Sequence, residues 1–387
     1  MAAINYPRNS SIENLIQSIK PDVVEGYIST KNEYFKDYDD GVTSIYRDKK
    51  HLNLQLKIPL RPDYDDYTFV LTDVIKSIAT LENKELWEII TNLKTDHPSD
   101  IIRYQLKGSD TDDGTAPLKS GANLYSGALD TIEASAFSIE RPSRIKYGYL
   151  KSVSDLVEQC RIGQTEYGSY SVPLICPLFT KEKDSINFMR WDEKPDGTFT
   201  RKVTTHLMKS LNHIVEVISN DNTEQLIHPL KDDMIINSKM YVALNEMKPD
   251  NTSLNLNIKS DWLIEPPKEK LSSTISINYD YFKEIENVAE ALAPEPETEI
   301  KEFVAKVHLL KDHLKQGHTY EYDRGQVGIV AIIPGGEVIR AKMTLTEEDY
   351  KKASNAHLTG KSVKIKGILK RGKRDHHITD IENFEII

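Results

Sequence analysis

A run of basic side chains near the C-terminus is the densest chemical feature of the sequence. Seven cations fall within fourteen positions, namely Lys361, Lys364, Lys366, Lys370, Arg371, Lys373 and Arg374. Because Lys and Arg neutralise phosphate groups, this run indicates contact with DNA or RNA. An exposed hairpin also carries Lys and Arg for solubility or to protect an edge strand, so a solvated hairpin remains the alternative.

The charge distribution points to the same part of the chain. The net charge of the 387 residues is −10, but residues 301–387 alone carry +4, which leaves −14 on the first 300. An acidic protein does not bind nucleic acid indiscriminately. If the protein binds a polyanion, we therefore expect the C-terminal part to bind it. The acidic remainder is expected to bind a protein partner.

A second polar group lies in the middle of the chain, between an expected helix and an expected strand. It combines two glycines, Gly163 and Gly168, with the polar residues Arg161, Gln164, Thr165, Glu166 and Ser169. Backbone-permissive and polar residues in one short connection favour a ligand or partner site. A tight connection in which Gly163 ends the helix and Arg161 pairs with Glu166 explains the same residues equally well.

Known catalytic patterns are missing from the sequence. It has no Walker motif, no dinucleotide-binding glycine pattern, no nucleophile elbow and no zinc-protease motif. The acidic group Asp63, Asp65 and Asp66 lacks the partners of a nuclease site and indicates a loop. We therefore expect no catalytic residue, metal or cofactor. The enzyme alternative is a metal-dependent nuclease or other phosphate-handling hydrolase that uses residues 161–169.

Composition places the chain among ordinary globular proteins. Hydrophobic residues make up 39% and charged residues 28%, and the only two cysteines are Cys160 and Cys176. Two cysteines are too few for a disulfide framework or a cysteine-rich zinc site. The sequence has no apolar run of membrane-spanning length and no secretory signal at its start. The expectation is a cytoplasmic protein without membrane contact.

The elements that must position these residues divide at a short linker. Residues 293–300 contain two prolines and three glutamates and predict an extended, solvated spacer. Before it, residues 1–292 predict a mixed α/β (α+β) body, with room for two subdomains. Helices are expected around 71–78, 86–93, 121–137, 152–160, 203–218 and 281–292, and strands at 52–58, 170–178 and 254–258. Pro173 and Pro177 place the 170–178 strand near a sheet edge.

After the linker, residues 301–387 predict a small five-stranded barrel. Strands are expected at 303–309, 320–333, 338–345, 363–369 and 378–384, with a capped helix at 346–357. Three strands, a helix and two more strands is the element order of the OB-fold, which this domain resembles. OB-folds often use the loop between strands four and five for ligands, and this loop corresponds here to residues 370–374.

The layout of the 161–170 region and the tail also resembles that of uncharacterised bacterial proteins encoded with antiviral defence genes. The resemblance assigns no residue a role. Together with the basic run, it implies a non-enzymatic nucleic-acid-binding or adaptor subunit of a bacterial complex, in which the body holds a protein partner and the barrel contacts DNA or RNA.

Overall fold

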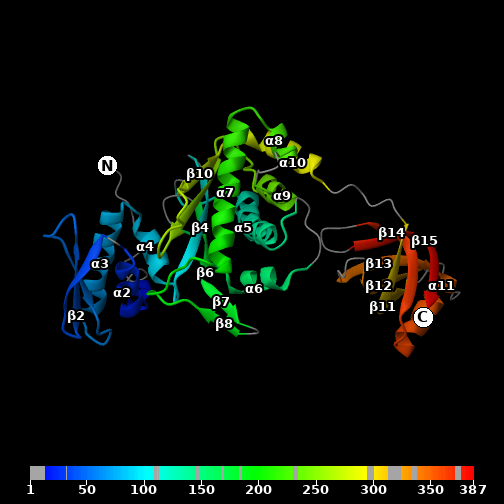
Figure 1. Cartoon of the computed structure of the whole chain (residues 1–387), viewed down its shortest axis with the longest axis horizontal. Coiled ribbons are helices and arrows are strands. Elements are labelled where there is room, and N and C mark those ends of the chain that lie inside the picture. Colours follow the sequence, from blue (N-terminus) through cyan, green and yellow to red (C-terminus); the bar gives the residue numbers. More distant parts are fainter. Residues whose placement is uncertain are drawn as a thin grey trace. The chain divides into compact units, whose positions relative to one another are not determined.

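The structure is a computed structural model of the whole chain. It describes residues 14–31, 33–108, 111, 113–143, 149–166, 170–182, 185–229, 234–293, 300–312, 324–332, 338–370 and 376–387. The chain divides into two compact units, with the main boundary between Leu292 and Ala293. The first is a mixed α/β body and the second a β-barrel, as the sequence predicts (Figure 1). Within the described residues, no helix combines the length and the apolar character needed to span a membrane.

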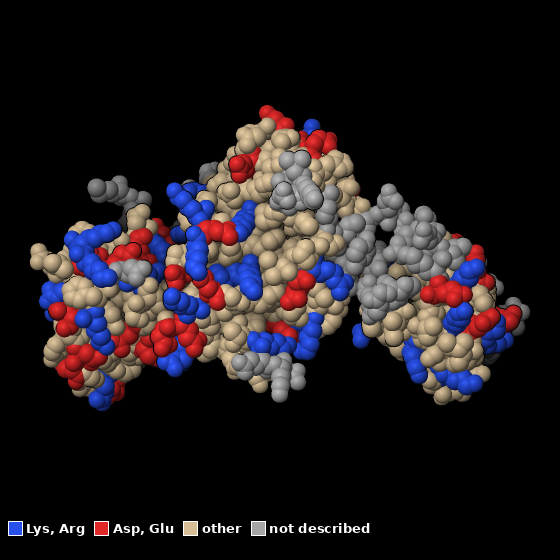
Figure 2. Space-filling model, in the orientation of Figure 1, with Lys and Arg blue, Asp and Glu red and all other residues tan. Residues whose placement is uncertain are grey.

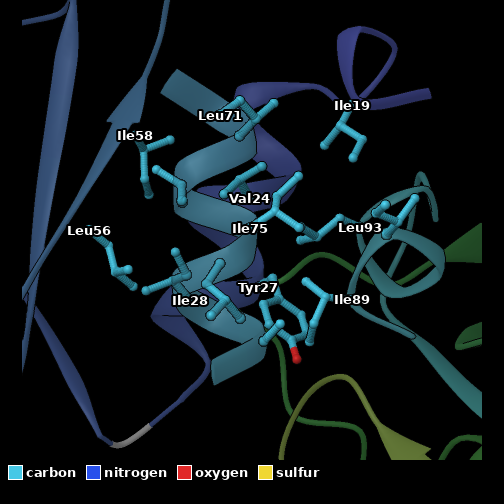
Figure 3. Close-up of a cluster of buried hydrophobic side chains, with 14 of the residues drawn as sticks. Ile19, Val24, Tyr27, Ile28, Leu56, Ile58, Leu71, Ile75, Ile89 and Leu93 are labelled. Atoms are coloured by element: carbon cyan, nitrogen blue, oxygen red, sulfur yellow. The ribbon is translucent and has the colours of Figure 1, made fainter. Parts of the chain in front are cut away.

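The N-terminal layer of the body is a three-stranded antiparallel sheet covered by helices. Its strands are β1 (Tyr34–Asp39), β2 (Thr43–Asp48) and β3 (Gln55–Pro59), and its helices are α2 (Pro21–Ser29), α3 (Tyr67–Glu82) and α4 (Leu86–Leu93). Leu56 and Ile58 alternate with polar neighbours along β3 and pack into a cluster with the helices (Figure 3). Alternation on one strand thus gives the sheet one apolar face for the helices to bury.

A second, five-stranded sheet lies at the centre of the body, with strand order β10-β9-β4-β6-β5. Its strands are β4 (Ser99–Lys107), β5 (Arg161–Ile162), β6 (Tyr170–Pro177), β9 (Asn255–Trp262) and β10 (Thr274–Ile277). The proline-containing strand β6 is next to the edge, because only the two-residue strand β5 lies beyond it. A separate hairpin is formed by β7 (Phe179–Glu182) and β8 (Ser185–Phe188).

Helices cover one face of this central sheet. Those in direct contact with its strands include α5 (Leu118–Glu140) and α7 (Phe199–Ser219), and α7 runs beside β4 in Figure 1. The other helices of this part of the body are α6 (Lys151–Gln159), α8 (Glu224–Ile227), α9 (Ser238–Glu246) and α10 (Tyr281–Ala291). Side chains of β4 alternate between the two faces. Tyr104 bonds to Thr131 of α5 and Asp100 to Arg201 of α7, whereas Ile101 packs into the N-terminal cluster. The opposite face of the sheet therefore receives the N-terminal layer.

The second unit is a closed barrel with strand order β11-β12-β13-β15-β14. It consists of β11 (Ile300–Asp312), β12 (Arg324–Ile332), β13 (Val338–Thr346), helix α11 (Glu347–Thr359), β14 (Val363–Lys370) and β15 (His376–Ile386). Strands β13 and β15 run parallel, while the other neighbours are antiparallel. The helix between the third and fourth strands confirms the predicted element order. Thr346 caps it by accepting a hydrogen bond from the backbone N–H of Asp349.

The packing of the barrel core explains why its strands could be predicted from the sequence. Phe303, Ala305 and Val307 of β11 alternate inward, and so do the corresponding residues of the other strands. Because one face of every strand is buried in the closed barrel, the period-two pattern is kept along most of the barrel, and it is interrupted at the register shifts after Val307 and after Lys366. Gly325 permits the close approach of α11, since a Cβ there would lie 2.1 Å from a ring atom of Tyr350.

Candidate functional site

The predicted basic run follows strand β14 and the turn after it. Lys361 precedes the strand and is exposed, Lys370 ends it and is exposed, and Lys364 and Lys366 lie between them. Arg371, Lys373 and Arg374 lie outside the described residues. Alternation along β14 points Val363 and Ile365 into the barrel and the two central lysines outward, as predicted.

The two central lysines are engaged by carboxylates of neighbouring strands. Lys364 Nζ lies 3.0 Å from Glu302 of β11, and Lys366 Nζ lies 2.7 Å from Glu382 of β15. The hydrogen bond and charge of Glu382 raise the pKa of Lys366. Exposed pairs of this kind contribute little stability, but each carboxylate competes with a phosphate for its lysine. The basic run is therefore a weaker polyanion site than its sequence indicates.

The adjoining outer surface of β11, β12 and β13 carries a row of exposed apolar side chains. Val304 stands opposite Ile332, and Ile332 stands opposite Val338, in the registers of the two antiparallel pairs. These side chains are 49%, 60% and 58% exposed, respectively. Lys364 stands opposite Val304 on its other side and ends the row. The three exposed aliphatic residues thus form one continuous cross-strand row.

Cations occupy the next rows of this surface. Lys306 stands opposite Val330, and Val330 stands opposite Arg340, one step along the same three strands. A further step brings Lys342 beside His377 of β15. Lys306 Nζ also donates to the carbonyl of Gly360, at 2.6 Å. We call this surface the β11–β13 face, defined by Val304, Lys306, Ile332, Val338, Arg340 and Lys342.

The 161–169 group is divided between the surface and the interior of the body. Gln164 and Thr165 are exposed, and Ser169 lies outside the described residues. Arg161 is exposed and donates to the carbonyls of Glu158 and Cys160 at the end of α6. Glu166 is buried, and its Oε2 accepts a hydrogen bond from Arg103. The structure thus pairs Glu166 with an arginine of β4 and leaves Arg161 on the helix end.

Glu166 belongs to a buried polar network between the central sheet and the N-terminal layer. We call it the Arg103 network; it contains Glu82, Lys84, Glu88, Asn92, Arg103, Glu166, Lys259 and Asp261. Arg103 is fully buried and donates to Glu166 at 2.8 Å and to Asp261 at 3.0 Å. It also donates to Asn92 of α4 at 3.0 Å, so its planar guanidinium group bonds to residues of both the central sheet and the N-terminal layer.

Opposite charges lower the pKa of one acid of this network, Asp261. Burial alone would raise the pKa of Asp261, but the charges of Lys84 and Arg103 outweigh it and keep that pKa well below its usual range. Lys84 bridges Asp261 and Glu82, each at 2.8 Å. Each carboxylate of the network thus forms an ion pair with at least one cation, and most of these ion pairs connect parts of the body that are far apart in the sequence.

Some buried oxygen atoms in the network and beside it have no hydrogen-bond partner within the described part of the chain. Among the described residues, Oε1 of Glu166, Oε1 of Glu82 and Oγ of Ser260 are buried without a hydrogen-bond partner. The hydrogen bonds from Arg103 to Asn92 and from Lys84 to Asp261 join the two layers of the body.

Sequence reasoning missed this network, although one signal was present. Arg103 is a single charge inside the run from Ile101 to Leu106, which is otherwise typical of a buried strand. Buried charges are rare unless paired, so this arginine predicts carboxylate partners. The partners themselves come from residues far along the chain, and no local pattern identifies them.

Comparison with known proteins finds no matching family model, no matching curated sequence and no matching solved structure. The resemblance to bacterial defence-associated proteins therefore stays a prediction.

Proposed function

We propose that the barrel binds single-stranded nucleic acid on the β11–β13 face. The observation that carries this proposal is the pairing of an exposed apolar row, Val304, Ile332 and Val338, with adjacent rows that contain Lys306, Arg340 and Lys342. Cations along a strand contact phosphates, while apolar side chains beside them contact the faces of unpaired bases.

The barrel architecture supports this choice of surface. Four of the six residues that define the face lie on the second and third strands of the barrel, where OB-folds bind oligonucleotides, and Val304 and Lys306 lie on the first strand. This support is an analogy between folds, since one fold carries many functions. The positive charge of residues 301–387, against the acidic first 300, adds an independent reason to place a polyanion on this unit.

In this proposal the body is a non-enzymatic scaffold. The contacts by which the Arg103 network joins the central sheet to the N-terminal layer support a structural role for its charged groups. Figure 2 shows both charge signs interspersed on the visible face of the molecule. An adaptor role for the body is the corresponding proposal, in which the net charge of −14 over the first 300 residues favours a basic protein partner.

The experiment is binding of the full-length chain to a fluorescent single-stranded oligonucleotide, as DNA and as RNA, beside the matching duplex. The test variant is Arg340→Ala with Lys342→Ala. The matched control is Lys351→Ala with Lys352→Ala, which removes the same charge from α11, where both lysines pair with acids of the helix.

We expect the test variant to bind at least about tenfold more weakly, a loss of about 1.4 kcal/mol, and the control to bind within about twofold of the wild type. Absence of binding at low salt, or equal losses in the two variants, would overturn the proposal. A preference for the duplex over the single strand would also overturn it.

A further inference from the structure

The only two cysteines of the chain lie opposite each other in the central sheet. Strand β5 pairs with β6 so that Arg161 faces Ile175 and Ile162 faces Leu174. The same register continues on the other side, where the N–H of Gly163 donates to the carbonyl of Pro173 at 2.8 Å. In the same register, Cys160, which precedes Arg161, lies opposite Cys176, which follows Ile175.

The hydrogen-bonding pattern makes this a close pair. Gly163 and Pro173 form a hydrogen-bonded position, and such positions recur at every second pair along an antiparallel ladder. Cys160 and Cys176 therefore take a non-hydrogen-bonded position, where opposed Cα atoms are about 4.5 Å apart and the side chains point to the same face. Disulfides span Cα separations of about 4.4–6.8 Å, so no backbone movement is needed.

The side chains confirm that the two thiols are neighbours. Both cysteines are free thiols, and Cys176 is fully buried while Cys160 is partly exposed. The hydrogen bond with the Cys160 thiol, and burial, raise the pKa of Cys176 well above its usual value. An oxidant in solution thus reaches Cys160 first, with a protonated second thiol directly beside it.

We propose that Cys160 and Cys176 are an oxidation site that forms a reversible intramolecular disulfide. Hydrogen peroxide is the oxidant. The thiolate of Cys160 attacks one peroxide oxygen, the O–O bond breaks, and the leaving oxygen takes a proton to give water and a sulfenic acid. The sulfur of Cys176 then attacks the Cys160 sulfur and gives up its proton, the S–O bond breaks, and a second water leaves. The two thiols lose two electrons, and the peroxide gains them.

The bridge restrains a defined part of the body. The N–H of Cys160 closes the last turn of α6 by donating to Leu156, so the disulfide ties the end of this helix to β6. The residues between the cysteines include Glu166, the partner of Arg103. A single buried cysteine commonly serves as a small apolar side chain in a protein core. That role explains Cys176, but it does not explain Cys160, which is partly exposed and lies opposite Cys176 in the same register.

The experiment treats the purified full-length chain with hydrogen peroxide and counts free thiols after denaturation. The count should fall from two to zero and return to two after dithiothreitol. Trypsin cuts between Arg161 and Ile162, so the cysteines lie on separate peptides, 152–161 and 162–181. A non-reducing digest of the oxidised chain should contain these two peptides joined, with the loss of two hydrogens.

Matched variants decide the result. Cys160→Ser and Cys176→Ala should each abolish the joined peptide, and Cys160→Ser should keep its one remaining thiol, because Cys176 is buried. Two thiols that persist under conditions that fully oxidise free cysteine would overturn the proposal. Sulfinic or sulfonic acid at Cys160 without the joined peptide would overturn it as well, and so would disulfide-linked dimers in place of it.

Discussion

The Nε of Arg103 lies 2.8 Å from Oε2 of Glu166, and both side chains are buried although 63 positions separate them in the chain. The same guanidinium reaches Asp261 from β9 and Asn92 from α4. One side chain on the central sheet therefore bonds to the sheet and to the N-terminal layer at once. Its removal tests how the body is held together.

Replacing Arg103 with Met should destabilise the body by about 3–5 kcal/mol, because Glu166 and Asp261 stay buried without their shared cation. Urea unfolding followed by tryptophan fluorescence measures this, and all three tryptophans, Trp87, Trp191 and Trp262, lie in the body. The control is Arg61→Met, which removes an exposed pair with Asp63 and should cost less than about 1 kcal/mol. Equal losses in the two variants would show that the network contributes no special stability.

The stability of the body should fall in acid through Asp261. Its folded-state pKa is held below the usual value, so the unfolded chain takes up the proton first as the pH falls. The contribution of Asp261 is complete above about pH 4 and is then lost at up to about 1.4 kcal/mol per pH unit. The difference in unfolding free energy between wild type and Asp261→Asn should therefore shrink below about pH 4.

The control for this pH series is Asp65→Asn, which makes the same change of charge at an exposed loop position. Urea titrations at several pH values between about 3 and 7 measure both differences. A difference between wild type and Asp261→Asn that stays constant with pH would contradict the assignment of a lowered pKa to Asp261.

Binding to a single-stranded oligonucleotide should weaken with salt, because phosphate contacts release counterions. Each phosphate contact contributes about −0.7 to the slope of log K against log salt concentration. Replacing Arg340 with Ala should flatten the slope by about this amount. Lys366→Ala should change it less, because Glu382 already pairs with that lysine at 2.7 Å. A larger effect at Lys366 would move the interface from the β11–β13 face to the basic run on β14.

Oxidation of the cysteine pair should stabilise the body against urea. A bridge that closes a loop of about 15 residues lowers the entropy of the unfolded chain, which contributes up to about 3 kcal/mol. The oxidised and reduced wild type are compared by tryptophan fluorescence, with Cys160→Ser treated in the same way. A peroxide-dependent gain that persists in Cys160→Ser would assign the stabilisation to another modification.

The sequence by itself determined the barrel, because its strands and helix are coded locally. Alternation in β11, a capped helix after Thr346 and period-two patterns in β14 survive in the fold because each strand buries one face in a closed core. The body was predicted less well. The sequence indicated helices α3 to α7 and α10, but strand β4 at the centre of the sheet was not recognised, because polar residues occupy five of its nine positions, on both of its faces.

Only the tertiary structure decided which residues meet. Arg103 and Asp261 contact each other because antiparallel strands β4 and β9 are neighbours, and Cys160 faces Cys176 because β5 and β6 share one register. The basic residues Lys364 and Lys366 were visible in the sequence, but their carboxylate partners came from β11 and β15. Strand register sets these contacts, and it depends on long-range pairing that no local pattern encodes.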